Sequence, residues 1–452
     1  MHHLLHSAAA ATLSLLAGAA LATNGMNMEA WGAKAGGMGG AAFAYDAGNS
    51  AVMNNPATLG LQPAEKSEIG LGLTLLMPTV ASSHPLAGGK DSGGDLYAMP
   101  TISWIKRSGP WAYGAAVLAQ GGMGTEYGSG SNLFAGGRAS DGTPAPLSGE
   151  EIRSEVGVGR VMFPLAFRAS DALTLAAQLD FVWATMDVKM DIDGFTLGQM
   201  MAGTPGVGSV SGSLPLPVGV YNFARFDFSD DKAFSGAAKG TGWAGKLGLH
   251  YQLSETLAVG AAWHSKTSID DLEAKHATMK VNVGGVTSTM TGKIKVLDFQ
   301  WPETYGIGLA WQATPKLMLA GDVKRIRWAD AMKDFSLKFE TAGGDLTAVM
   351  EQNWRDQTVY SFGGQYMVAP DLALRAGFNY AKNPVPDATL NPLFPATVTR
   401  HFTFGIGWRM GKDETLAASL AYAPRASDTN PNTGITSTHR QTTLRVNYNY
   451  AY

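Results

Sequence analysis

The stretch 444–452 alternates strictly between apolar and polar or small side chains. Leu444, Val446, Tyr448, Tyr450 and Tyr452 occupy the even positions, with Arg, Asn and Ala between them. Because side chains on a β-strand point alternately to its two faces, the stretch predicts a strand with one apolar face. The aromatic residue at the last position favours a membrane barrel, whose apolar face contacts lipid, over a soluble sandwich, whose apolar face points inward.

The same period of two recurs along most of the chain. It is clear over 173–183, 257–263, 372–380, 402–408 and 416–422, where apolar residues alternate with small or polar ones. About fourteen strands are expected, an even number as in bacterial single-chain barrels, and several exceed the roughly 10 residues that cross a membrane. The expected strands are 68–80, 96–106, 111–123, 151–168, 171–190, 240–252, 255–269, 293–312, 316–328, 352–368, 371–383, 400–410, 414–424 and 440–452.

The connections between these strands alternate between short and long. Tight turns lie at 107–110, 169–170, 253–254, 313–315, 369–370 and 411–413, and long loops at about 81–95, 124–150, 191–239, 270–292, 329–351, 384–399 and 425–439. Periplasmic turns and extracellular loops produce this alternation. The predicted fold is an all-β, closed antiparallel transmembrane barrel, because an open edge in hydrocarbon would leave backbone groups unpaired.

Composition agrees with a large β-structure and excludes several functions. The chain has 56 glycines, 11 tryptophans and only 16% charged residues. A net charge of −3 without a basic tract gives no reason to expect nucleic acid as a partner. Because the sequence has no cysteine, disulfide frameworks, thiolate nucleophiles and cysteine metal sites are excluded.

The N-terminal stretch has the pattern of a cleaved signal peptide. Residues 4–22 are apolar and small, and they end in Ala20-Leu21-Ala22, an A-x-A cleavage pattern. The alternative is a transmembrane anchor, but the run is short and no stop-transfer pattern follows. We therefore expect residues 1–22 to be removed. The rest of the sequence contains no apolar run of about 18 residues, so no transmembrane helix is predicted.

The stretch from Trp31 to Gly60 is almost free of charge and rich in glycine and alanine. It matches neither an amphipathic helix nor a half-buried strand, and every strand expected from the alternation follows it. We therefore expect residues 23–66 to form a hatch, or plug, in the lumen of a barrel made by residues 67–452.

Two features of this hatch have a physical interpretation. Asn55 and Pro56 fit the cap and the first position of a short helix, with Ala57 following. A cluster of glycines permits either a hinge or simply close packing in a crowded lumen. These glycines are Gly36, Gly37, Gly39 and Gly40.

Catalytic motifs are absent from the sequence. It has no G-x-S-x-G, H-E-x-x-H or P-loop motif, and its Gly-rich tracts lack the strand–turn–helix context of a dinucleotide site. The 9 histidines are scattered, and His250 and His264 fit lumen or interface positions better than metal ligation. We therefore expect no catalytic residues, no cofactor and no metal site, and thus no enzyme.

Several motifs match one known family in the right order along the chain. The segment G-G-M-G-G-A-A-F-A-Y-D-A-G-N-S-A-V-M-N-N-P-A-T-L, with its Asn-Pro-Ala signature at residues 55–57, resembles the N-terminal hatch of the long-chain fatty acid and aromatic hydrocarbon transporters (FadL/TodX). The stretch 121–127 resembles the end of that family's third strand, with Gly-Gly-Met in place of the usual P-F-G. Similar matches at 353–356, 372–380 and 383–387 extend the resemblance over essentially the whole mature chain.

The resemblance implies a fourteen-stranded monomeric barrel that takes up fatty acids or aromatic hydrocarbons across the outer membrane of a Gram-negative bacterium. Ligand would land between the third and fourth extracellular loops, move to an interior site and leave when the hatch shifts. Part of the exit would be a lateral opening at the third strand, formed by Gly121, Gly122, Met123 and Gly124. Outer-membrane lipid and lipopolysaccharide would surround the barrel, and the barrel-assembly machinery would bind Tyr452.

Candidate ligand contacts follow from side-chain chemistry. The third long loop is apolar and rich in methionine, which suits varied apolar ligands, although these residues could instead pack against the fourth loop as a lid. They are Phe195, Leu197, Met200, Met201, Leu214, Leu216, Tyr221 and Phe223. For a fatty-acid carboxylate, Lys324 and Arg375 are possible partners. The alternative is that both belong to a salt-bridge network in the lumen.

The predicted function is passive, hatch-gated uptake of hydrophobic small molecules across the outer membrane. A general diffusion porin for polar solutes would share the barrel but would need an open, charge-lined constriction. The Gly/Ala-rich hatch and the apolar third loop argue against that alternative. A lipase-type barrel enzyme is a further alternative, which no motif in the sequence supports.

Overall fold

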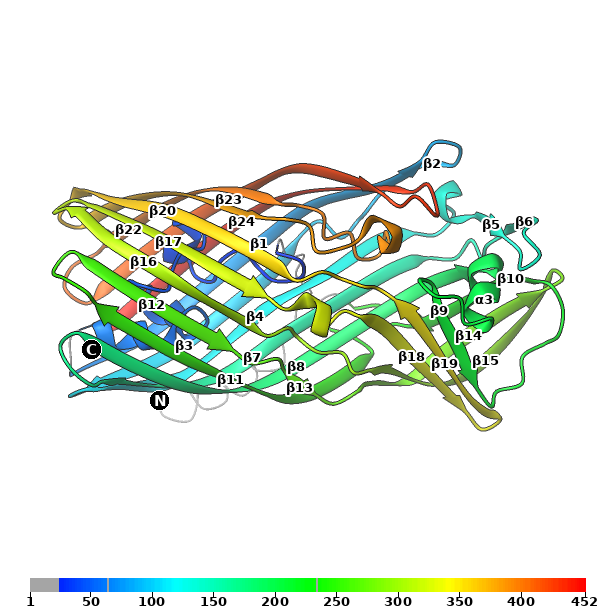
Figure 1. Ribbon diagram of the computed structural model, residues 1–452, viewed down its shortest axis with the longest axis horizontal. Coiled ribbons are helices and arrows are strands. Elements are labelled where there is room, and N and C mark those ends of the chain that lie inside the picture. The colour runs from blue at the N-terminus through cyan, green and yellow to red at the C-terminus, as the bar shows by residue number, and fades with distance from the viewer. Residues whose placement is uncertain (1–23, 63–64, 233–234) are drawn as a thin grey trace, which may run out of the picture.

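The alternating segments form long antiparallel strands, which the computed structural model describes over residues 24–62, 65–232 and 235–452. The expected signal peptide, 1–22, lies outside the described residues. One circuit of paired strands is closed, because the last strand pairs with the first (Figure 1). In order around the circuit, its members are β1 (Lys66–His84), β3 (Tyr97–Ser108), β4 (Trp111–Gly128), β7 (Ile152–Arg168), β8 (Leu173–Asp193), β11 (Ala238–Gln252), β12 (Leu257–His264), β16 (Thr304–Thr314), β17 (Leu317–Ile326), β20 (Gln357–Ala369), β21 (Leu372–Ala381), β22 (Arg400–Arg409), β23 (Glu414–Thr429) and β24 (Thr436–Ala451).

Two strands from the long loops form a second connection within the sheet. β10 (Tyr221–Phe228) pairs with β8, β14 (Leu272–Val283) pairs with β10, and β14 also meets β11. Counted with these two, the barrel has 16 strands, so the predicted number of about fourteen is wrong. The reason is that 191–239 and 270–292, which the alternation of short and long connections predicts to be loops, contain enough β-forming side chains to continue the sheet.

Further strands extend the sheet on the loop side, to a total of 22 strands within the described ranges. They are β2 (Gly88–Asp91), β9 (Gly208–Gly212), β13 (Ser268–Ile269), β15 (Val286–Leu297), β18 (Asp334–Thr341) and β19 (Gly344–Glu351). β5 (Gly136–Arg138) and β6 (Pro144–Pro146) form a separate hairpin, and β5 contacts α3 (Gly194–Met201) and η3 (Asn132–Phe134). Two further short helices are η4 (Trp328–Asp330) and η5 (Asp387–Thr389). In Figure 1, α3, β5, β6, β9 and β19 lie at the end of the barrel opposite the C-terminus, as extracellular loops would.

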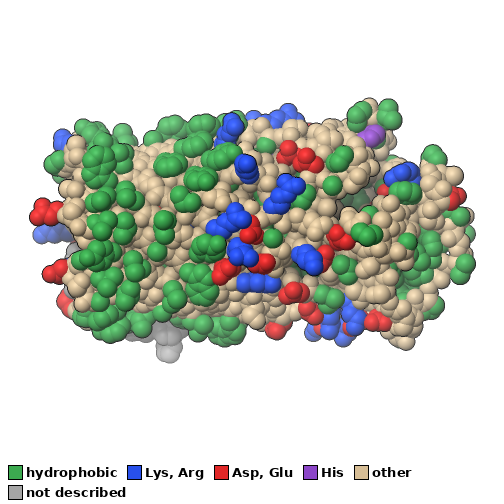
Figure 2. Space-filling view, in the orientation of Figure 1, with side chains coloured by type: hydrophobic (Ala, Val, Ile, Leu, Met, Phe, Trp, Pro, Cys, Tyr) green, Lys and Arg blue, Asp and Glu red, His purple; other side chains and the backbone are tan. Residues whose placement is uncertain are grey.

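The apolar face of the alternating strands points outward. Leu247 and Ile307 are 55% and 68% exposed, whereas the inward-facing Lys246 and Thr403 are buried. Figure 2 shows hydrophobic side chains over the half of the barrel away from the loops, and charged side chains mainly nearer the loops. An apolar exterior with a polar interior is the arrangement of a barrel surrounded by lipid. No helix within the described ranges has the length and hydropathy to span a membrane.

The N-terminal segment (Asn24–Gln62) lies in the lumen of this barrel. It contains α2 (Ala33–Gly37), η1 (Gly48–Val52) and η2 (Pro56–Leu61), and most of its residues are buried. Most of its alanines, together with Met38 and Met53, form one apolar cluster with wall residues, whereas Met26 and Met28 belong to a second cluster nearer the loops. β1 begins at Lys66, beside the boundary predicted between residues 66 and 67.

Glycines of the barrel wall make room for the backbone of the N-terminal segment. A Cβ atom on Gly260 of β12 would lie 1.8 Å from the carbonyl oxygen of Phe43. A Cβ atom on Gly363 of β20 would lie 2.4 Å from the carbonyl oxygen of Met38. Glycine inside a strand commonly marks such a close approach of another backbone. The wall is therefore shaped to the segment that fills it.

Candidate functional site

Asn55 fastens the end of the N-terminal segment to the barrel wall. Its side-chain oxygen accepts a hydrogen bond of 3.1 Å from the Ala57 amide, so Asn55 caps η2 and Pro56 is the first helical residue, as the sequence predicts. Its side-chain nitrogen donates to the carbonyl oxygens of Phe43 at 2.7 Å and Leu249 at 2.9 Å. Asn55 is fully buried, and it joins η2, the middle of the segment and β11.

The hatch glycines lie where the segment is closest to the wall. Gly36 and Gly37 end α2, and Gly39 and Gly40 follow with φ angles of 67° and 83°, which favour glycine. A Cβ atom on Gly37 would lie 3.0 Å from the Cα atom of Gly405, and one on Gly39 would meet the backbone of β20 and β21 at 2.5–2.6 Å. Close packing therefore accounts for these glycines, and a hinge role stays a prediction.

Lys324 and Arg375 both lie in the lumen and bind protein groups. Lys324 Nζ donates to the carbonyl oxygen of Gly40 at 3.0 Å. Arg375 Nε donates to Gln365 Oε1 at 2.8 Å. Both contacts are hydrogen bonds to neutral acceptors, so the salt-bridge network that the sequence offers as an alternative stays a prediction for these two residues.

Two further contacts tie the N-terminal segment to the wall. Arg445 of β24 forms an ion pair of 2.8 Å with Glu29, and both side chains are fully buried. Asp322 Oδ2 on β17 accepts a hydrogen bond of 2.7 Å from the Ala42 amide. Polar groups of widely separated strands thus fix the position of the segment.

Strand β4 loses one of its neighbours halfway along. β3 pairs with β4 from Trp111 up to Val117, and within the described part of the chain no pair between the two strands lies beyond Val117. β4 continues to pair with β7 after a register shift between Ala119 and Gly121. The predicted residues of the lateral opening all lie in this part of β4 and are buried: Gly121, Gly122, Met123 and Gly124.

The beginning of the N-terminal segment covers this part of β4. Asn27 forms an isolated β-bridge with Gly121, and the Gly122 amide donates to the carbonyl oxygen of Met26 at 3.2 Å. A Cβ atom on Gly121 would lie 2.3 Å from that oxygen, so only glycine permits the approach. The segment thus supplies backbone hydrogen bonds beside the place where β3 no longer pairs.

Three tryptophans hold the other side of this turn. The rings of Trp301 and Trp328 pack edge to face with centroids 5.8 Å apart, and Trp328 and Trp354 do so at 5.2 Å. Trp301 Nε1 donates to Asn27 Oδ1 at 2.7 Å. A Cβ atom on Gly25 would lie 2.6 Å from the Trp328 ring, so the turn fits tightly against the indoles.

A small apolar cavity lies beside Met26. Its volume is about 20 Å³, close to the space that one water molecule needs, so a larger ligand must displace side chains. Methionines are unbranched and adapt easily to such changes. None of the described lining residues is charged: Met26, Val156, Met186, Met190, Phe299, Met332, Phe335, Met350, Gln352, Asn391, Leu393 and Phe394.

The residues predicted on the third loop are divided between α3, a connecting stretch and β10. The described lining of the cavity includes none of them. Phe195 packs against Arg138, whose Cζ atom lies 3.8 Å from the ring centroid. Burial favours packing for half of the set: Leu197, Met200, Tyr221 and Phe223 are buried, Phe195, Leu214 and Leu216 are half-buried, and Met201 is exposed.

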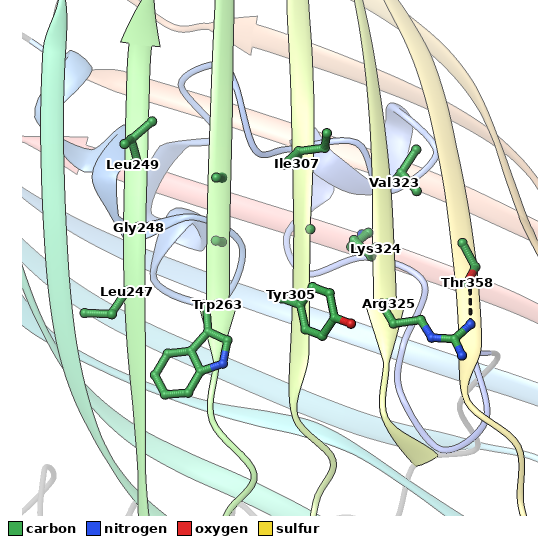
Figure 3. A pocket seen from close by; sticks show the side chains of 13 residues that line it. Leu247, Gly248, Leu249, Trp263, Tyr305, Ile307, Val323, Lys324, Arg325 and Thr358 are labelled. Carbon is green, nitrogen blue, oxygen red and sulfur yellow. Dashed lines mark hydrogen bonds between the residues drawn. The ribbon is translucent and has the colours of Figure 1, made fainter. Parts of the chain in front are cut away.

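A second apolar hollow, of about 500 Å³, lies on the outer face of the barrel across β11, β12, β16 and β17. Figure 3 shows Trp263 and Tyr305 near one end, and Arg325 donating to Thr358 Oγ1 at 2.9 Å. Ile307 in this groove is 68% exposed, so the groove faces the surroundings of the barrel and not its lumen.

The fold and the filled lumen define an outer-membrane β-barrel transport protein. The model of the family "Outer membrane protein transport protein (OMPP1/FadL/TodX)" matches residues 8–450, and the chain belongs to this family. It is therefore an outer-membrane protein of a Gram-negative bacterium, in a family of transport channels and not of enzymes.

Solved structures agree with this assignment. The toluene transporter TodX of P. putida is 28% identical, with a TM-score of 0.79 over 94% of this chain and 99% of that chain. The toluene transporter TbuX of Ralstonia pickettii is also 28% identical, with a TM-score of 0.75 over 93% of this chain and 98% of that chain.

Curated relatives match over shorter stretches. An uncharacterized protein of Chlorobium limicola is 45% identical over 25% of this chain and 55% of its own length. Outer membrane protein P1 of Haemophilus influenzae is 29% identical over 32% of this chain and 29% of its own length. The chain thus spans about half or less of the length of these relatives.

Proposed function

We propose that the chain takes up small hydrophobic molecules passively, by a route that the N-terminal segment opens and closes. One observation carries the proposal: Met26 and Asn27 bind Gly121 and Gly122 where β4 no longer pairs with β3. If this turn moves away, β4 is left with unpaired backbone on one side. In this proposal residues 1–22 are the signal peptide, 23–66 the hatch and 67–452 the barrel.

The proposed route has three stages. Ligand first adsorbs to the apolar third loop, where Met201 is exposed and Phe195 and Leu214 are half-buried. It then enters the methionine- and phenylalanine-lined cavity beside Met26. Finally, displacement of the hatch lets it leave laterally between β3 and the Gly121–Gly124 part of β4.

The cavity favours a neutral ligand over a fatty acid. Its described lining carries no charge, and Lys324 and Arg375 contact protein groups elsewhere in the lumen. A carboxylate in such surroundings would lack a counter-charge, which is costly. A cavity of about 150 Å³ accommodates benzene, so the methionines must move to admit an aromatic ring. TodX and TbuX are described as toluene transporters, and an aromatic hydrocarbon is the substrate class we propose here.

The exterior features fit a monomer in the outer membrane. The groove between Trp263 and Ile307 would hold acyl chains of outer-membrane lipid or lipopolysaccharide, with Arg325 near the headgroups. Tyr452 is 59% exposed and is available to the barrel-assembly machinery as an aromatic end.

The test is uptake of radiolabelled toluene and oleate by cells with and without the chain. Toluene uptake should depend on the chain and should be lost when residues 24–60 are deleted, because ligand contacts near Met26 and Asn27 disappear. If cells without the chain take up toluene and oleate as fast as cells with it, the proposal is refuted. A steady large single-channel current from the intact chain would instead indicate a diffusion porin.

A further inference from the structure

A network of buried polar side chains connects β4 with the N-terminal segment. Arg160 of β7 donates through Nε to Gln120 Oε1 on β4. Its Nη1 atom donates to Asp180 Oδ2 on β8 at 2.7 Å, and Lys246 Nζ on β11 lies 3.5 Å from the same oxygen. Lys246 Nζ then donates to the carbonyl oxygen of Val52 at 2.7 Å. Four neighbouring strands are thereby joined to the end of η1.

The first end of this network is Gln120, the inserted residue of β4. Gln120 lies in the register shift between Ala119 and Gly121, just beyond the last pair with β3. An inserted residue of this kind leaves the ladder and bends its strand. The Gln120 side chain binds Arg160, and its carbonyl oxygen accepts a hydrogen bond of 3.1 Å from Trp31 Nε1. Contacts from both wall and hatch therefore fix the bulge.

The other end of the network is Lys246, whose contacts depend on the position of the N-terminal segment. Lys246 is fully buried, and its partners besides Asp180 are neutral groups: the Val52 carbonyl and the sulfur atoms of Met53 at 3.2 Å and Met162 at 3.6 Å. Two of these groups belong to the N-terminal segment. Displacing η1 would leave the ammonium group with fewer partners in a buried site, which is energetically unfavourable.

The shared carboxylate explains how a movement at the Lys246 end of the network changes the contacts at the Gln120 end. Arg160 and Lys246 share Asp180, the carboxylate between them, and all three side chains are at most 1% exposed. If Lys246 loses Val52, it must rely more on Asp180, which weakens the hold of Asp180 on Arg160. Arg160 in turn positions Gln120. The two ends of the network therefore depend on the same carboxylate, that of Asp180.

We propose that Gln120, Arg160, Asp180 and Lys246 couple the position of the hatch to the geometry of the β4 bulge, so that hatch displacement and opening of β4 are one transition. These are positioning residues, and the inference rests on the proposed function. Lys324 lacks this connection: it also donates to a hatch carbonyl, that of Gly40, but from β17, away from β4.

Two matched lysine variants test the coupling in the full-length protein in detergent. Lys246→Met leaves the Arg160–Asp180 pair in place and removes the contacts of the ammonium group with Asp180 and Val52. Gln178 Nε2 still donates to the Val52 carbonyl oxygen at 3.0 Å and to Asp180 Oδ1 at 2.6 Å, so the variant weakens the connection to the segment without abolishing it. Lys324→Met removes a buried lysine that is hydrogen-bonded to the hatch, and it leaves the network that leads to β4 unchanged. Amide hydrogen exchange at Gly121–Gly124 should rise in Lys246→Met by roughly 5-fold to 150-fold, the usual range of coupling between sites, and stay near wild type in Lys324→Met.

The reciprocal variant is Gln120→Ala, which removes the first contact without changing any charge. Because coupling is mutual, exchange at residues 48–54 should rise in this variant. The coupling is refuted if amide exchange at Gly121–Gly124 is equal in the two lysine variants. It is also refuted if amide exchange of residues 48–54 is the same in Gln120→Ala as in the wild type. Heat-modifiable migration on gels verifies that each barrel is folded. Hydrogen exchange needs no substrate, so a failed uptake experiment would refute the proposed function and leave this result independent.

Discussion

Trp301 Nε1 donates a hydrogen bond of 2.7 Å to Asn27 Oδ1, and both side chains are almost completely buried. Asn27 also bridges Gly121, so it lies between the loop before β16 and the part of β4 that has lost β3. This single side chain holds the turn of the hatch against the proposed exit.

Replacing Asn27 by alanine should loosen the turn by about 1–3 kcal/mol, because the Trp301 indole N–H would remain buried without its acceptor. Amide exchange of residues 24–31 measures this loss. Trp301→Phe in the Asn27→Ala background removes the stranded donor and should restore part of the protection. Additive effects of the two substitutions would contradict a direct interaction.

Gly260→Ala should displace the hatch from β12. The new methyl carbon would lie 1.8 Å from the Phe43 carbonyl oxygen, and relieving such overpacking typically costs about 1–3 kcal/mol. Gly245→Ala is the matched control, because its new methyl carbon would lie 3.8 Å from the carbonyl oxygen of Gln178, an ordinary van der Waals distance. Limited proteolysis of the hatch should be faster only in Gly260→Ala; equal digestion of both variants would be inconsistent with the close approach.

The alternation of side chains predicts most of the wall because the pattern depends only on which face meets lipid. The expected strand 240–252, for example, corresponds to β11 (Ala238–Gln252). The expected strand 293–312 is wrong: β15 ends at Leu297 and β16 begins at Thr304. Asp298 has a φ of 48° and Pro302 has no amide hydrogen, so both interrupt a ladder that apolar content alone would continue.

The site was less predictable than the fold. The Asn55 cap follows from local chemistry, since an Asn-Pro pair at a helix start is recognised over two residues. The cavity is assembled from distant stretches, with Met26, Met186 and Met350 on the hatch, β8 and β19. No local period brings these residues together, and the number of methionines in the sequence, 20, was the only available signal.

Met350→Ala should tighten toluene binding by up to about tenfold, or 1.4 kcal/mol, because the ring would no longer need to displace that thioether. Met290→Ala is the control, since this half-buried methionine of β15 is not among the described residues lining the cavity. Binding of labelled toluene to purified protein measures the effect. Similar affinities in the two variants would place the ligand elsewhere.

Arg375→Gln should leave toluene uptake within about twofold of wild type, since the guanidinium contacts Gln365 and does not line the cavity. Competition by oleate should also be unchanged. If oleate competition is lost while toluene uptake persists, Arg375 is a carboxylate partner and the preference for a neutral ligand is wrong.

Asn55 offers the sharpest test of the Asn-Pro-Ala motif, because its oxygen and its nitrogen have separate tasks. Asn55→Asp keeps an acceptor for the Ala57 amide but directs a carboxylate at the carbonyl oxygens of Phe43 and Leu249. Asn55→Ala removes the cap and the donors without adding charge, at a cost of about 1–2 kcal/mol for the cap. Asn55→Asp should therefore expose residues 43–57 to hydrogen exchange more than Asn55→Ala does at neutral pH. Acidification should reduce this excess, because a protonated carboxyl can again donate to one carbonyl oxygen. If Asn55→Asp is as protected as wild type at neutral pH, the amide nitrogen does not hold the hatch to β11, and the cap alone explains the motif.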